Sequence, residues 1–131
     1  MNIEDFRKTH RLLKEYVHEW HPIYRGYNNR TLYINVDTLE FKEKPVNEEM
    51  KEKFTGGKGF GLKLLWEGTL PTTKWNDPEN EVVISPGPIA GITQYSGTGK
   101  SLVVSISPTN FVMDSNVGGF FGPFLKFCGF D

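Results

Sequence analysis

The sequence predicts an α+β fold with a β-rich core and few helices. Apolar side chains alternate along residues 31–37 and again along residues 102–107, which is typical of β-strands. Residues 2–20 carry an apolar stripe at helical spacing, and a leucine-rich helix follows a glycine cluster at residues 55–61. With 131 residues, 37% of them hydrophobic, the chain is expected to form one compact domain.

The bulk composition disfavours several classes of function. A net charge of −1 disfavours a nucleic-acid partner, and no apolar run approaches the roughly 18 residues that span a membrane. The chain begins with acidic residues rather than a basic, apolar leader, so a cytoplasmic protein is expected. Its one cysteine, Cys128, excludes an internal disulfide and an iron–sulfur cluster held by this chain alone.

Charge is distributed unevenly along the chain. Six of the ten phenylalanines follow residue 80, where little charge remains to cover the surface. Large apolar surfaces of this kind usually mark an interface, so we expect a partner or further chain to cover it. The charged residues in this part are Glu81, Lys100, Asp114, Lys126 and Asp131.

Residues 2–20 are predicted to form an amphipathic helix that begins at an Asn2 N-cap and ends before Pro22. We expect this helix to dock on the sheet or on a partner. His18 and His21 have a spacing that places two imidazoles on one helical face, but a zinc site needs further ligands. A solvated or docking helix is therefore favoured over a metal site.

The middle of the chain reads as a hairpin followed by two helices. A turn at Asp37-Thr38 joins the strand over residues 31–37 to a second strand that runs through Phe41 to Val46. Asn47 is expected to cap a charged helix over residues 48–54. The glycines of residues 55–61 only partly match a dinucleotide fingerprint, because no strand precedes them, so a close-packed turn between helices is favoured.

The last third is predicted to hold two strands and two glycine turns. Residues 81–85 read as a buried strand, and residues 120–127 as an aromatic helix or helical turn interrupted by Pro123. The first glycine turn ends in Lys100 and precedes the strand over residues 102–107; the second covers residues 116–119. Glycine amides near one cation suit a phosphate-bearing ligand.

The Gly99-Lys100-Ser101 sequence also invites a P-loop interpretation. That motif needs a glycine five residues before Gly99, where the chain has Gln94, and a helix after the lysine, where a strand is predicted. Nucleotide hydrolysis is therefore disfavoured. A hairpin turn with an exposed lysine remains the simple alternative.

Six segments in matching order give the chain a resemblance over roughly a hundred residues. In one of these segments, Lys100 stands seven residues before Ser107-Pro108. The chain resembles the beginning of the tungsten-containing aldehyde:ferredoxin oxidoreductase family. The other matching segments are Asn35-Val36-Asp37-Thr38, Gly56-Gly57-Lys58-Gly59, residues 78–91, 116–122 and 125–131.

The resemblance implies a saddle-like domain of two sheets beneath a bis-pterin tungsten or molybdenum cofactor. It implies that Lys100 replaces an arginine that contacts the pterin and its phosphate, which leaves a point charge in place of a planar fork. It implies that the backbone carbonyl of Asn116 binds a magnesium ion between the pterin phosphates, and that Gly118 and Gly119 form a turn against the pterin. No catalytic residue is expected in this chain.

The resemblance further implies which parts of the enzyme this chain forms and which a partner supplies. Residues 1–30 are expected to form a helical extension, and residues 31–131 the first part of the tungstopterin-binding domain. A larger partner chain is expected to supply the other domains and a 4Fe–4S cluster, with aldehyde oxidation and ferredoxin as electron acceptor. The chain alone is expected to be inactive. The alternative is a noncatalytic interaction module that keeps the saddle fold.

Overall fold

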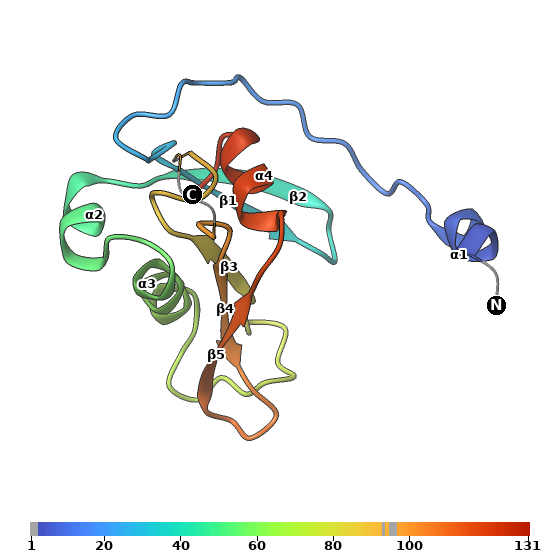
Figure 1. Cartoon of the computed structure of the whole chain (residues 1–131). Helices are drawn as coiled ribbons and strands as arrows, with labels where there is room; N and C mark the ends of the chain where they lie inside the picture. Colours follow the sequence, from blue (N-terminus) through green and yellow to red (C-terminus); the bar gives the residue numbers. More distant parts are fainter. Residues whose placement is uncertain (1–2, 93, 95–96) are drawn as a thin grey trace.

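The computed structural model describes residues 3–92, 94 and 97–131, which form an α+β fold of two small sheets and four helices (Figure 1). This arrangement confirms the predicted fold class. No helix in the described ranges has the length and apolar character needed to cross a membrane. The elements in chain order are α1 (Ile3–Thr9), β1 (Arg30–Asn35), β2 (Glu40–Pro45), α2 (Glu48–Phe54), α3 (Lys58–Gly68), β3 (Val83–Pro86), β4 (Ser101–Ile106), β5 (Val112–Val117) and α4 (Phe121–Phe127).

The first sheet is the predicted hairpin of β1 and β2, which pair antiparallel. Its turn is stabilised by Asn35, whose side-chain oxygen accepts hydrogen bonds from the backbone N–H groups of Asp37, at 3.0 Å, and Thr38, at 2.9 Å. Asn47 then caps α2 as predicted, because its side chain accepts the N–H of Met50 at 2.8 Å. The glycine turn at residues 55–57 leads directly from α2 into α3.

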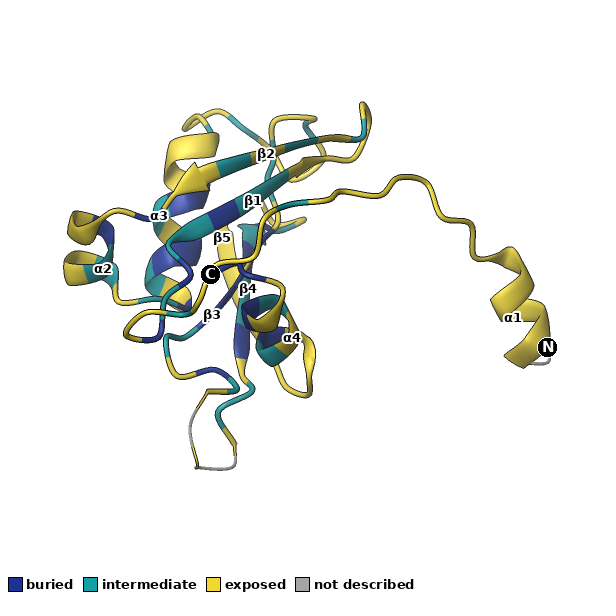
Figure 2. Ribbon diagram, turned by 90° about the horizontal axis from the view of Figure 1, so that it is seen from above, coloured by how far each residue is buried: buried dark blue, intermediate teal, exposed yellow. Residues whose placement is uncertain are grey.

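The hydrophobic core lies where α3 packs on the second sheet (Figure 2). Phe60 and Leu65 of α3 and Val104 of β4 are the most deeply buried apolar side chains of this cluster. Gly61 permits the close approach, because a Cβ at this position would lie 2.5 Å from a methyl group of Val104. The packing of α3 on the sheet therefore holds β4 in place.

The second sheet has the order β3-β4-β5, with both pairings antiparallel. The prediction that residues 81–85 are buried throughout is wrong, since Val82 is 66% exposed and Ile84 is 37% exposed. Val83 and Ser85 of β3 are buried, whereas Ile84 between them faces the surface, because successive side chains of a strand point to opposite faces. Strand β5 was not predicted, and all six of its residues are exposed.

The predicted helix over residues 2–20 is much shorter in the structure and ends at Thr9. Its proposed cap, Asn2, lies outside the described residues. Residues 10–23, here called the N-terminal strap, run on without helix and carry α1 away from the domain (Figure 1). Tyr16 and His18 both contact the domain, and side chains two residues apart share a face only in extended chain. These contacts compete with the helix.

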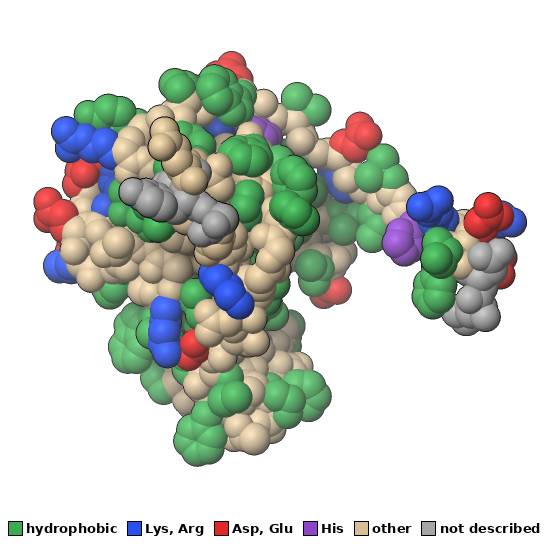
Figure 3. Space-filling view, in the orientation of Figure 1, with side chains coloured by type: hydrophobic (Ala, Val, Ile, Leu, Met, Phe, Trp, Pro, Cys, Tyr) green, Lys and Arg blue, Asp and Glu red, His purple; other side chains and the backbone are tan. Residues whose placement is uncertain are grey.

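The aromatic helix is continuous in the structure, and Pro123 does not interrupt it. Pro123 is the third residue of α4, where its missing N–H removes no bond within the helix. Figure 3 shows hydrophobic side chains gathered over α4 and at the far end of the second sheet. The exposed phenylalanines of this surface are Phe111, Phe120, Phe121, Phe124 and Phe127.

Glu81 predicts a pH dependence of the fold. Its carboxylate packs against the backbone of Gly68, and burial raises its pKa above the usual 4.5, an effect that the charge of Lys44 only partly offsets. A raised pKa means that this carboxyl favours the folded state most at low pH and loses that contribution as pH rises through the folded value. We expect Glu81→Gln to equal the parent in urea unfolding near pH 4 and to exceed its stability at pH 7. Equal stability at both pH values would contradict this assignment.

Candidate functional site

The candidate site lies at the end of the second sheet where β4 begins and β5 ends. Ser101 pairs with Val117 and Leu102 pairs with Asn116 in the antiparallel register. Lys100 immediately precedes β4, and the two glycines 118 and 119 immediately follow β5. The antiparallel pairing therefore brings two glycine turns to the same edge, although they are far apart in the sequence.

Distances confirm that the turns lie side by side. A Cβ placed on Gly118 would lie 3.6 Å from the Nζ of Lys100, and one placed on Gly99 would lie 2.6 Å from the carbonyl oxygen of Gly119. The structure thus brings all four sequence-derived positions together. Asn116, however, is the fifth residue of strand β5 and not part of the turn, because its pairing with Leu102 extends the ladder.

The surface between these turns is bare backbone. Gly119 has φ +94° and Gly97 has φ +89°, and a Cβ on either residue would meet no atom of the described residues within 4 Å. Backbone amides without neighbouring side chains can approach a large planar ligand or a phosphate group closely. The arrangement suits a ligand that rests on the backbone.

The charge at this edge is positive. Within residues 3–92, 94 and 97–131, the side chain of Lys100 makes no hydrogen bond or ion pair, and it is exposed. The nearby carboxylate of Asp114 is already paired with Lys58 at 2.6 Å. An exposed, unpaired ammonium beside open backbone favours an anionic group as its ligand.

The structure rejects the P-loop interpretation of the same residues. The chain continues from Lys100 into strand β4 and not into a helix. A P-loop requires helical N–H groups directly after its lysine. Residue Ser96, which begins the glycine turn, lies outside the described residues. The histidines of the strap belong to no group of three metal-ligating side chains in the described ranges.

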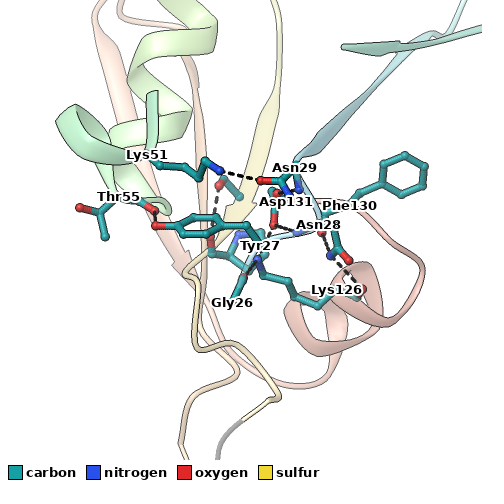
Figure 4. Close-up of polar contacts among 11 residues, drawn as sticks. Gly26, Tyr27, Asn28, Asn29, Lys51, Thr55, Lys126, Phe130 and Asp131 are labelled. Carbon is teal, nitrogen blue, oxygen red and sulfur yellow. Dashed lines mark hydrogen bonds and ion pairs between the residues drawn. The ribbon is translucent and has the colours of Figure 1, made fainter. Parts of the chain in front are cut away.

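Sequence reasoning missed a buried ionic cluster that anchors α4 beside the site (Figure 4). Lys126 and Asp131 form an ion pair with side chains only 1% and 2% exposed. The Lys126 ammonium also donates to the carbonyl of Gly26 at 2.6 Å. The Asp131 carboxylate accepts the backbone N–H groups of Asn28 at 3.0 Å and Asn29 at 2.7 Å.

This cluster ties the segment before β1 to residues 126–131. Asn28 donates from its side-chain amide to the carbonyls of Lys126 and Phe130, both at 3.0 Å. The N–H of Asp131 donates to the carbonyl of Arg30 at 2.8 Å. No local sequence pattern predicts such a cluster, because a lysine within an aromatic helix is expected to lie at the surface.

Comparison with known proteins finds relatives over most of the chain. A family model described as aldehyde ferredoxin oxidoreductase, N-terminal domain, matches residues 31–131. The tungsten-containing aldehyde ferredoxin oxidoreductase of Pyrococcus horikoshii is 36% identical over 107 residues, which cover 81% of this chain and 18% of that protein. The enzyme of the same name from Thermococcus kodakarensis is 39% identical over 103 residues, covering 78% of this chain and 17% of that protein.

Two further comparisons extend this picture. The aliphatic sulfonate oxidoreductase, WOR-like subunit, of Pyrococcus furiosus is 33% identical over 109 residues, covering 81% of this chain and 17% of that protein. The active-site complex BamBC of benzoyl coenzyme A reductase, solved with 1,5-dienoyl-CoA, superposes with a TM-score of 0.77 at 27% identity. That match covers 82% of this chain and 16% of the solved chain, so the chain spans less than a fifth of these relatives.

Proposed function

The chain belongs to the aldehyde ferredoxin oxidoreductase family, matched in its N-terminal domain, and on that premise we propose that it holds one side of a tungsten–pterin cofactor in a larger oxidoreductase. The observation that carries the proposal is the convergence of the unpaired Lys100 ammonium with the bare turn at Gly118 and Gly119. A pterin with its phosphate needs a flat, open surface and a cation within reach, and this edge offers both.

Each residue has a distinct role in this proposal. Lys100 binds the phosphate and pterin edge through one charged point of contact, and Gly118 and Gly119 support the ring system without side chains. The backbone carbonyl of Asn116 would provide an oxygen ligand for a magnesium ion at the pterin phosphates, since magnesium prefers oxygen ligands. Strand β5 suits this role because it is an edge strand, and an edge leaves backbone groups without a neighbouring strand.

The bound tungsten centre supplies two-electron oxidation chemistry, which in this proposal converts an aldehyde to a carboxylic acid with ferredoxin as the acceptor. This chain binds and orients the cofactor and contributes no group that transfers a proton. A companion polypeptide supplies the remaining domains and a 4Fe–4S cluster. The chain alone is therefore inactive in this proposal, and molybdenum can take the place of tungsten.

The exposed apolar surface supports the need for a companion. Phe120 is 76% exposed and Phe124 is 60% exposed, and the edge strand β5 beside them is exposed along its whole length. Large apolar side chains that gather on an exposed surface usually mark an interface.

The test uses the chain with whatever co-purifies from its native host. We expect Lys100→Met and Gly118→Ala each to lower the bound tungsten or molybdenum per protein about tenfold, equal to about 1.4 kcal/mol of binding. Gly118→Ala introduces no close contact, because the new Cβ would lie 3.6 Å from Lys100, so its folding is expected to be unchanged. Lys42→Met, at an exposed position on β2, is the control and should retain the metal.

Elemental analysis together with mass spectrometry of the co-purifying chains measures the outcome. Full metal content in both variants would contradict the cofactor assignment and favour the noncatalytic interaction module.

A further inference from the structure

Arg30 carries hydrogen-bond donors that the described residues leave unused. Its Nη1 donates to the carboxylate of Glu43 at 3.2 Å. Its Nε and Nη2 are buried and have no hydrogen-bond partner. A buried donor without an acceptor costs about 1–3 kcal/mol, and more when the group is charged. Two such donors on one guanidinium indicate that an acceptor belongs there.

The two donors have a geometry that selects the acceptor. Nε and Nη2 form one edge of the planar guanidinium, and their parallel N–H bonds match the two oxygens of a carboxylate. The backbone at Gly129 leaves little space beside the guanidinium, because a Cβ on Gly129 would lie only 2.7 Å from Nη2. The ring of Phe130 lies 5.2 Å from the guanidinium carbon. A flat carboxylate fits such a space better than a tetrahedral phosphate.

The carboxylates of this chain that lie nearby are already engaged. Glu43 bonds to Nη1 of Arg30 and also accepts the hydroxyl of Tyr16 at 2.9 Å. Asp131 is held by Lys126 and by two backbone N–H groups. Neither of these two carboxylates bonds to the open edge, which leaves it available to a carboxylate from outside the described residues.

The N-terminal strap lies over this place and is weakly attached. The Cε1 of His18 would lie 3.5 Å from a Cβ on Gly129, the point that is also close to Nη2 of Arg30. The strap's other anchor is Tyr16, whose ring stacks on Phe41 at 5.0 Å. Within the described residues, positions 11–23 of the strap make no backbone hydrogen bond to the sheet. Side chains alone hold it, so it can leave at low cost.

We propose that the strap is a removable cover over a carboxylate-binding edge of Arg30, and that a carboxylate of the companion polypeptide replaces it on assembly. The companion is the one invoked in the proposed function. The exchange gains a bidentate, charge-assisted pair and loses two ring contacts and one tyrosine hydrogen bond. Assembly would therefore release the strap together with α1.

The edge can be tested on the chain alone with sodium acetate as the probe. The sequence has four arginines, and the Nε–H groups of Arg7, Arg11 and Arg25, all exposed, serve as internal references in ¹⁵N-resolved NMR. In Tyr16→Ala/His18→Ala, which frees the strap, we expect acetate to shift the Arg30 Nε–H signal with an affinity about fivefold or more above that of the parent. Phosphate is expected to bind less tightly than acetate.

Two controls keep the test decisive. In Arg30→Lys in the freed background, which removes the fork but keeps the charge, the acetate-dependent shifts of the neighbouring Gly129 and Phe130 backbone amide signals should be lost. Tyr16→Phe alone should give an intermediate affinity, and it guards against misfolding of the double variant. Equal acetate affinity in the parent and the freed variants would overturn the proposal. So would an Arg30 Nε–H that exchanges its proton with buried water and does not respond to acetate.

A second arm examines the assembled protein. Trypsin should cleave at Arg11 and Lys14 several-fold faster in the complex than in the isolated chain, because the strap is released. Unchanged cleavage in a complex that retains tungsten would overturn the strap exchange while leaving the cofactor assignment intact. Because the acetate arm needs neither metal nor companion, a failure of the proposed function cannot be mistaken for its failure.

Discussion

Replacing Lys126 with methionine is expected to remove about 3–5 kcal/mol from the free energy of unfolding, out of roughly 5–15 kcal/mol for a typical domain. Methionine has a similar length and fills the same buried space. The Asp131 carboxylate, 2% exposed at its side chain, would then be left as a buried charge without its counter-ion. The carbonyl of Gly26 would also lose its donor. Urea unfolding monitored by tryptophan fluorescence measures the loss.

Lys53→Met is the matched control for this substitution. Lys53 also forms an ion pair, with Glu49 at 2.6 Å, but their side chains are 61% and 69% exposed. Solvent screens such a pair, so the expected change is much smaller than that of Lys126→Met. If Lys126→Met and Lys53→Met had similar effects, the buried cluster would not be the anchor that its geometry indicates.

Gly26→Ala is expected to cost about 2–5 kcal/mol for two independent reasons. The backbone at Gly26 has φ +87°, a left-handed conformation that L-residues adopt at a cost. The new Cβ would also lie 2.4 Å from the backbone carbonyl oxygen of Pro88, which cannot rotate away as a side chain does. Either the turn at Gly26 or the loop at Pro88 has to move.

Gly97→Ala separates these two causes. Gly97 has nearly the same φ, +89°, but a Cβ there meets nothing within 4 Å. Its substitution carries only the conformational cost, about 1–2 kcal/mol. Thermal unfolding of both variants gives the difference, which reports the contact with Pro88. Equal losses would refute a close approach between these segments.

Local patterns were sufficient to predict the hairpin and α2. Alternation together with a turn at Asp37-Thr38 specifies β1 and β2, and the Asn47 side chain specifies where α2 begins. Both features depend on residues within a few positions of one another. The members of the candidate site were named from the sequence because glycine turns and a lysine are visible there. Their proximity depends on the pairing of β4 with β5, and their role stays a prediction.

The errors arose where distant contacts decide the structure. The helix over residues 2–20 was extended too far, because Tyr16 and His18 find partners on β2 and at Phe130 that the local pattern does not show. Strand β5 was missed, since Asp114 and its polar neighbours are poor strand formers and only pairing with β4 makes them a strand.

The buried ionic cluster was beyond local reasoning altogether. Its members lie near opposite ends of the chain, and each of them is ordinary in its local sequence. Sequence similarity singled out residues 125–131 but indicated no structural role for them. The structure shows this role, because Lys126 and Asp131 anchor α4 to the segment at Gly26 to Arg30.

The same cluster affects the order in which the protein takes shape during synthesis. Asn28 and Asp131 are 103 positions apart. At roughly 5–20 residues per second, Asn28 leaves the ribosome about 5–20 s before Asp131, whose carboxylate accepts its backbone N–H. During that interval the hairpin can form, but the domain cannot close. We therefore expect this closure to be the last step of folding and the first to be lost, so that weakening it raises the unfolding rate more than it slows folding.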